Sequence, residues 1–535
     1  MTERPNIILI TTDQQRYDAL GASGNSVIKT PNMDRLASEG VLFENAISPC
    51  PLCVPARASL ISGYACGRIG GLDNDGASDL KEDDTFAAAL SRSGYHTQAI
   101  GKMHFMPCPP HKVKYGMDHM ILSEEMRGLR WAPTPEDITF DDYDQFLIKN
   151  NAWGWEKPPE IGYNEIKPLI NPLPPELHIT RWCGETASQW LRQDRPEDKP
   201  FFLWTSFVKP HVPYDCPVHL TELYNPDDMP EPWIGDEGVK GRNPGFSAKR
   251  HHLEFDLYSR TALKRARAYY YANITFIDSE IGRILDTLSS EGLSENTLVI
   301  FTSDHGDLLG DHGQWYKSVG YEGSLRVPMI LRWPGHITPG TKNLDIVNLT
   351  DIYPTVLKAA GLEPGAMRPG EDLLDFAKGH IQRDLSVSEF GHPPNAHLHV
   401  RQLKWKYLWY QNGSFEELYD LENDPRELND LSQDFAYKQI MDNLKDAARE
   451  WVNKWSRPDL YFDETGNLLS KPYQEEIVEK TEWGQSANPF SRMPWESRIP
   501  PVLIPEGKRS WWWNMAGLDW SKLVNSILRG KKDIE

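Results

Sequence analysis

The residues best suited to covalent chemistry lie in the segment Cys53-Val54-Pro55-Ala56-Arg57. A helical stretch at 56–62 follows and ends at Gly63; proline suits the first turn of a helix, and glycine suits the position just past its end. We therefore place Cys53 at a helix N-terminus, where free backbone N–H groups and the helix dipole favour an anion. Arg57, one turn into the helix, carries a planar guanidinium that suits a tetrahedral oxyanion. The segment predicts a site for such an anion next to Cys53.

Cys50 and Cys53 also form a Cys-x-x-Cys pair, which is typical of redox pairs and of half a zinc site. No second Cys-x-x-Cys or paired-His motif completes a zinc site. Redox pairs of this kind belong to a small thioredoxin-like context. A cysteine phosphatase loop needs a longer spacer than the three residues between Cys53 and Arg57. The zinc and phosphatase alternatives therefore fail on their motifs, and the redox alternative stays open.

Ionisable residues follow four short β-like runs, at 6–11, 96–100, 201–208 and 298–302. Each run is nearly continuous in apolar or β-branched residues, as expected for strands covered on both faces. Helical patterns at 85–93 and 265–288 lie between them. This alternation predicts an α/β fold, with a mainly parallel central sheet sandwiched by helices. Ligands of such sheets bind beyond the carboxyl ends of the strands, so we expect the residues that follow the four runs to meet at one rim.

The pattern changes near residue 385. Strand-like runs at 385–390, 399–403, 406–410 and 417–420, with a turn at Asn412-Gly413, precede an amphipathic helix at 436–455. We predict a catalytic α/β domain at 1–380, a smaller α+β domain at 381–460 and an aromatic-rich tail at 461–535. The tail contains Trp511-Trp512-Trp513, so it either wraps its own domain or docks on another subunit, and we expect subunit contacts in a homo-oligomer, a dimer or tetramer. Residues 215–260 are interpreted as an insertion or lid.

The composition limits the classes of partner. A net charge of −20 argues against a nucleic-acid binder, although a local cluster of cations can still bind an anionic substrate. No apolar run is long enough to span a bilayer, and the run at 7–10 is too short for a signal peptide. Six cysteines in 535 residues do not make a disulfide scaffold. We expect a cytoplasmic protein that binds neither nucleic acid nor a membrane.

The run from Cys53 to Arg57, continued by Ala58-Ser59-Leu60-Ile61-Ser62-Gly63, resembles the signature of type I sulfatases and related phosphonate monoester hydrolases. They belong to the alkaline phosphatase superfamily, and supporting matches run from Asn6 to about Asp430. In that family a separate formylglycine-generating enzyme oxidises the signature cysteine to formylglycine. The resemblance implies an alkaline-phosphatase-like fold and an arylsulfatase-like enzyme that hydrolyses small anionic esters.

The resemblance also implies a role for each cluster at the rim. The residues that match metal ligands are Asp13, Gln14, Cys53, Asp304 and His305. The residues that match catalytic groups are Cys53, Arg57, Lys102, His104, His211 and Lys317, and Asn74 matches an Asn that holds the formylglycine diol. Oxygen ligands with one imidazole suit a single Ca²⁺ ion first, with Mn²⁺ or Mg²⁺ as alternatives.

Gln14 and His305 depart from the pattern of many sulfatases, which have Asp and Asn in these places. Both residues are closer to the phosphonate monoester hydrolase branch. Sulfate ester hydrolysis is therefore the first functional hypothesis, and hydrolysis of phosphonate monoesters or phosphate diesters at the same site is the second. A non-catalytic, anion-binding relative is the third.

Overall fold

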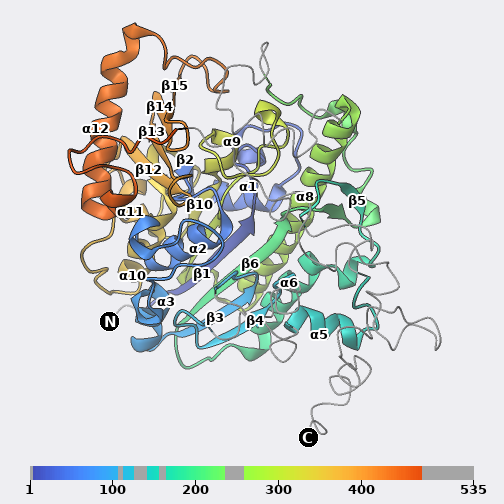
Figure 1. Ribbon diagram of the computed structural model, residues 1–535. Coiled ribbons are helices and arrows are strands. Elements are labelled where there is room, and N and C mark those ends of the chain that lie inside the picture. The colour runs from blue at the N-terminus through green and yellow to red at the C-terminus, as the bar shows by residue number, and fades with distance from the viewer. Residues whose placement is uncertain (1–3, 107–112, 126–140, 156–163, 235–257, 473–535) are drawn as a thin grey trace, which may run out of the picture.

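A computed structural model describes residues 4–106, 113–125, 141–155, 164–234 and 258–472 of the chain. Its largest element is a nine-stranded sheet between helices (Figure 1). The strand order is β11–β2–β10–β8–β1–β6–β3–β4, and β9 pairs with β2. Neighbouring strands are parallel except at the pairs made by β9 and β10. The strands are β1 (Asn6–Asp13), β2 (Val41–Ile47), β3 (His96–Gly101), β4 (His119–Leu122), β6 (Phe201–Pro210), β8 (Thr297–Ser303), β9 (Arg326–Val327), β10 (Met329–Arg332) and β11 (Thr341–Asn348).

Strand β1 shows why both faces of the sheet are covered. Its side chains alternate, so that Ile8 and Ile10 are buried in one core, while Ile7 and Leu9 are buried in the core on the opposite face. A continuous apolar run is the pattern that such a strand requires. The first core includes side chains of α1 (Pro31–Ser38), α5 (Asp142–Lys149), α6 (Ile179–Gln189) and α8 (Arg260–Ser290), and the second includes those of α2 (Cys53–Ser62), α3 (Phe86–Arg92), α10 (Ile352–Ala359) and α11 (Leu373–Ala377).

The four strands predicted from the sequence are β1, β3, β6 and β8, and they lie side by side in the order β8–β1–β6–β3. All three contacts between them are parallel. Their carboxyl ends therefore share one edge, and the prediction of a mainly parallel α/β sheet is confirmed. Two strands run two residues further than expected, β1 to Asp13 and β6 to Pro210, and β3 and β8 each run one residue further at this end.

A second, four-stranded antiparallel sheet follows in the chain, with α12 (Lys438–Trp455) packed on it. Its strands are β12 (Leu385–Phe390), β13 (His397–Gln402), β14 (Trp405–Tyr410) and β15 (Phe415–Asp420). These elements confirm the α+β character of this region, and the domain boundaries stay a prediction. Most of the expected tail, including the tryptophan triplet, and residues 235–257 of the expected insertion lie outside the described residues.

Buried charges join this small sheet to the main one through α9 (Glu322–Leu325). The Glu322 carboxylate lies 3.1 Å from Arg401 Nε and 2.9 Å from Lys406 Nζ, and all three side chains are at most 5% exposed. Burial acts to raise the pKa of Glu322, but the two cations hold it well below its usual range.

Glu322→Ala should therefore lower the free energy of unfolding by about 3–5 kcal/mol, because two buried cations lose a shared partner. Urea unfolding checks this, with Glu422→Ala as control. Glu422 pairs with Lys404 on the surface, and its removal should leave the midpoint unchanged.

The buried His178 caps helix α6 and gives a pH-dependent prediction. Its Nδ1 accepts a hydrogen bond from Thr180 N at 3.1 Å, so Nδ1 carries no proton. Burial lowers the pKa of His178 to about 4. The folded pKa lies below the unfolded value of 6.5. The contribution of the neutral His178 ring to the free energy of unfolding is therefore complete above pH 6.5 and is lost as the pH falls towards 4. Between pH 7 and pH 5 the loss should be about 2 kcal/mol. Denaturant titrations at both pH values should show that His178→Asn, which keeps a capping acceptor, removes this part of the pH dependence. An unchanged dependence in the variant would contradict the assignment.

Candidate active site

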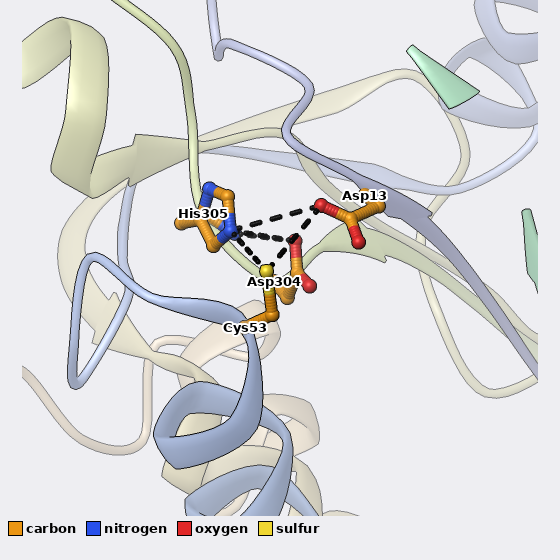
Figure 2. A group of neighbouring side chains, drawn as sticks. All are labelled: Asp13, Cys53, Asp304 and His305. Atoms are coloured by element: carbon orange, nitrogen blue, oxygen red, sulfur yellow. Dashed lines mark hydrogen bonds and ion pairs between the residues drawn. The ribbon is translucent and has the colours of Figure 1, made fainter. Parts of the chain in front are cut away.

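Helix α2 begins at Cys53, and this end of the helix faces the carboxyl ends of β1 and β8 (Figure 2). The residue before the helix provides no side-chain cap. Instead Asn74 Oδ1 accepts a hydrogen bond from Val54 N at 3.2 Å. The helix ends at Gly63, which has a φ of 71° that suits glycine, and its N–H donates to the Ser59 carbonyl. The expected position of Cys53 at a helix N-terminus is confirmed.

Four side chains that are far apart in the sequence meet at this point: Asp13, Cys53, Asp304 and His305 (Figure 2). One ligand atom of each lies within 4.8 Å of the other three. Cys53 Sγ is 3.1 Å from His305 Nε2 and 3.8 Å from Asp13 Oδ1. All four side chains are at most 2% exposed. Buried carboxylates beside an imidazole and a sulfur are a donor set that fits a divalent ion, so the residues present suit the expected metal.

The hydrogen bonds of His305 assign its two ring nitrogens. Nδ1 lies 2.9 Å from the Gly306 carbonyl, which can only accept, so Nδ1 carries the proton. Burial acts to lower the pKa of His305, but Asp304 and Cys53 raise it above its ordinary value. In the neutral form of the ring, Nε2 keeps its lone pair and points at Cys53, which is the arrangement found in metal-binding histidines. Burial and Asp13 act to raise the pKa of the Cys53 thiol, but Lys317 and His305 outweigh them and lower it below its ordinary value.

Two buried cations compensate the carboxylates. Arg57 Nε lies 2.8 Å from Asp304 Oδ2, and Arg57 Nη2 lies 3.8 Å from Asp13 Oδ2. Lys102 forms an ion pair with Asp13 and lies 3.2 Å from Glu125. Burial acts to raise the pKa of Asp13, but Lys102 and the other cations hold it well below its usual range. Asp13 is therefore ionised at neutral pH and able to bind a cation.

Gln14 and Lys317 lie at the same centre. The backbone N of Gln14 donates to Asp304 Oδ1 at 3.1 Å, and its side-chain oxygen accepts a hydrogen bond from Lys317 Nζ. The structure thus brings Gln14 beside the metal-ligand candidates and turns its oxygen towards a cation.

The two expected histidines outside the cluster are both buried. His211 Nδ1 lies 2.8 Å from the Val212 carbonyl, so Nε2 is the nitrogen that exchanges a proton. Burial, Lys317 and Lys102 lower the pKa of His211 well below its usual value, and the ring is neutral at pH 7. His104 lies two residues after Lys102, and its backbone N donates a hydrogen bond to Glu124 Oε1 at 2.8 Å.

Several polar residues of the site were not predicted from the sequence. Glu125 contacts Lys102 and lies 3.9 Å from His211. Ser206 Oγ accepts a hydrogen bond from Arg57 at 2.9 Å. Asp307 accepts one from Gln14. Glu125 follows β4, so the sequence signal that could have revealed Glu125 is a strand followed by ionisable residues. That strand has only four residues and begins at an exposed histidine, which hides the pattern.

The structure does not favour the redox alternative for Cys50 and Cys53. Cys50 is fully buried, and burial together with a hydrogen bond to Cys66 raises its pKa well above the ordinary value. Cys50 is therefore held as a thiol beside Cys66, whereas Cys53 contacts His305. The five described cysteines are all free, and Cys108 lies outside the described residues.

Comparison with known proteins decides the family. A family model described as Sulfatase matches residues 5–362, which include every site residue named above and more than half of the chain. The chain belongs to the sulfatase family. A second model, described as N-sulphoglucosamine sulphohydrolase, C-terminal, matches residues 310–454 of this sulfatase.

Individual relatives agree with this assignment. This sulfatase is 36% identical over 494 residues to an arylsulfatase of Clostridium perfringens, which covers 88% of this chain and 98% of that protein. It is 28% identical to a choline-sulfatase of Rhizobium meliloti, over 81% of this chain and 83% of that protein. These similarities identify an arylsulfatase-like sulfuric ester hydrolase, and they do not favour the non-catalytic alternative.

A solved structure extends the comparison to the fold. The phosphonate monoester hydrolase of Agrobacterium radiobacter superimposes on this sulfatase with a TM-score of 0.69 and 26% identity, over 88% of this chain and all of that one. The expected alkaline-phosphatase-like architecture is therefore confirmed. Within the described residues, no helix combines the length and the hydropathy that a membrane crossing requires.

Proposed function

We propose that this sulfatase hydrolyses sulfate esters with residue 53, in its formylglycine form, as the nucleophile. The observation that carries the proposal is the convergence of Cys53 with Asp13, Asp304 and His305 at the start of α2. As a hydrated aldehyde, residue 53 supplies one hydroxyl to attack sulfur and a second whose deprotonation expels the sulfate, a step that a thiol cannot complete.

A divalent ion is part of the proposal. Asp13, Gln14, Asp304, His305 and residue 53 would hold it. The ion would supply Lewis acidity that lowers the pKa of a hydroxyl at position 53. We propose Ca²⁺ because most of these ligands are oxygens, and Mn²⁺ or Mg²⁺ as alternatives.

The remaining charged residues bind the ester and move its proton. Arg57, Lys102 and Lys317 offer cations to the sulfate oxygens, whose charge grows in the transition state. His211 is neutral in the chain alone because burial and two lysines disfavour its charged form. A bound anion offsets these lysines, so His211 can gain a proton at Nε2 and donate it to the leaving oxygen.

The mass of the peptide that contains residue 53, isolated from active protein, tests the nucleophile. We expect an aldehyde in place of the thiol. Fully active protein with an unmodified Cys53 peptide would contradict the formylglycine proposal.

A second candidate is hydrolysis of phosphonate monoesters and phosphate diesters at the same site. It is favoured by His305 in the metal-ligand set, by the amide of Gln14 in place of a second carboxylate, and by the similarity to a phosphonate monoester hydrolase. Parallel measurements of kcat/KM on an aryl sulfate, a phosphonate monoester and a phosphate diester distinguish the two. We expect the aryl sulfate to give the highest value, and a higher value on either phosphorus ester would favour the second candidate.

We also propose a cytoplasmic location, a formylglycine-generating enzyme as maturation partner, and a homo-oligomeric state. The free thiols of the described cysteines support the location, because reduced cysteines are typical of a reducing compartment. The burial of Cys53 supports a separate, early maturation step. Light scattering of the full chain tests the oligomeric state.

A further inference from the structure

Asp307 is a fully buried carboxylate that contacts the side chain of Gln14 rather than the centre of the site. Its Oδ2 accepts hydrogen bonds from Gln14 Nε2 at 2.5 Å and from the Tyr214 hydroxyl at 2.7 Å. Its Oδ1 accepts a third from Leu309 N at 2.9 Å. Tyr214 lies in β7 (Tyr214–Cys216), a short strand outside the main sheet. An ionised carboxylate only accepts, and all three of these neighbours donate to it.

The backbone of Gln14 is fixed from both sides. Its N–H donates to Asp304 Oδ1 at 3.1 Å, and its carbonyl accepts from the Tyr270 hydroxyl at 2.7 Å. With φ at 75°, the residue is held in the left-handed region. The amide at the end of the side chain can still rotate, and such a flip exchanges the positions of its oxygen and its nitrogen.

We propose that Asp307 is a positioning residue that makes Gln14 present its oxygen, and not its nitrogen, to the cations of the site. The NH₂ group must face Asp307, since that carboxylate cannot donate. The oxygen then faces the other way, where it accepts a hydrogen bond from Lys317. A carboxylate at position 14 would present an oxygen in either orientation, whereas an amide needs a neighbour that selects one. The part of this inference that concerns a divalent ion rests on the proposed function.

Tyr214 strengthens the selection. Burial and the adjacent Asp307 raise the pKa of its hydroxyl well above the usual value, so Tyr214 remains a donor. With Leu309 N also donating, Asp307 has no orientation in which it offers a proton to Gln14. Tyr214 and Gln14 therefore both donate hydrogen bonds to Asp307, and Lys317 donates one to Gln14.

A reciprocal pair of substitutions tests the proposal. In Asp307→Asn, the new amide must keep its oxygen on Leu309 N, so its NH₂ turns Gln14 around and places an NH₂ group at the metal position. In Gln14→Glu, two carboxylates face each other. In the double variant, the amide at position 307 donates to the carboxylate at position 14, which restores a matched pair with the donor and the acceptor exchanged.

The first measurement is calorimetric titration of the chelator-treated full chain with Mn²⁺ and with Ca²⁺. We expect Asp307→Asn to weaken binding by about 10- to 100-fold, as is usual for residues that orient a ligand, and Gln14→Glu to keep it, because a carboxylate presents an oxygen in either orientation. The double variant should regain most of the affinity. A residue with a purely structural role would give losses that add.

The second measurement is the urea midpoint of the metal-free proteins. It should fall in each single variant and recover in the double variant. Additive losses in both measurements, or wild-type Mn²⁺ and Ca²⁺ affinity in Asp307→Asn, would overturn the proposal. If the wild-type chain bound neither ion, the proposed metal would be wrong, while recovery of the midpoint would still support the orienting role of Asp307.

Discussion

Replacing Cys53 by alanine is expected to lower kcat by on the order of 10⁴- to 10⁶-fold, the range observed when an enzyme loses its nucleophile. Residue 53 lies where the helix N-terminus, Asp13, Asp304 and His305 all meet. Alanine offers no precursor of an aldehyde, so neither the attack nor the release of sulfate has a group to perform it. Steady-state kinetics on an aryl sulfate measure the effect.

Cys183→Ala is the matched control. Cys183 is a cysteine of α6 that is 1% exposed, and burial raises its pKa, so it stays an inert thiol. Its replacement should leave kcat within a few-fold of the wild-type value. Urea unfolding should show that both variants remain folded. If Cys53→Ala kept near-normal turnover, the nucleophile would have to be sought elsewhere.

Removing the proposed divalent ion with a chelator is expected to abolish turnover and to destabilise the fold. Asp13 and Asp304 lie against His305 and Cys53, and without an ion their charges are balanced only by neighbours such as Lys102 and Arg57. An ion present at a hundred times its Kd stabilises the native state by about 3 kcal/mol, which chelation would remove. Activity and the urea midpoint, measured before chelation, after it and after return of Ca²⁺ or Mn²⁺, check this.

Two variants separate the cluster from general effects of charge. Asp304→Asn weakens one ligand and should raise the concentration of ion needed for half-maximal activity. Asp463→Asn changes an exposed carboxylate outside the cluster and should leave this concentration unchanged. Full turnover after exhaustive chelation would exclude the ion from the mechanism.

The sequence predicted those elements whose own residue pattern reflects their place in the fold. Strands β1, β3, β6 and β8 are apolar on both faces, and each is followed by residues of the site, so their number, direction and shared edge could be predicted. The start of α2 could be predicted in the same way, because Pro55 and Gly63 mark its two ends.

Other elements are specified by their partners rather than by their own residues. Strand β10 has four residues and pairs antiparallel with β2 and β8, and its direction cannot be inferred from so short a run. The contribution of Asp307 depends on Gln14 and Tyr214, which come from distant parts of the chain. Such contacts exist only after folding, so a pattern along the sequence does not reveal them.

The centre is assembled from segments that leave the ribosome at very different times. His305 follows Cys53 by 252 residues. At about 5–20 residues per second, translation separates the two by on the order of 10 to 50 seconds. During this interval the nascent chain carries the thiol without Asp304 and His305, two of the three side chains that later meet it. The order of synthesis therefore opens a period in which a modifying enzyme can reach Cys53, and completion of β8 closes it.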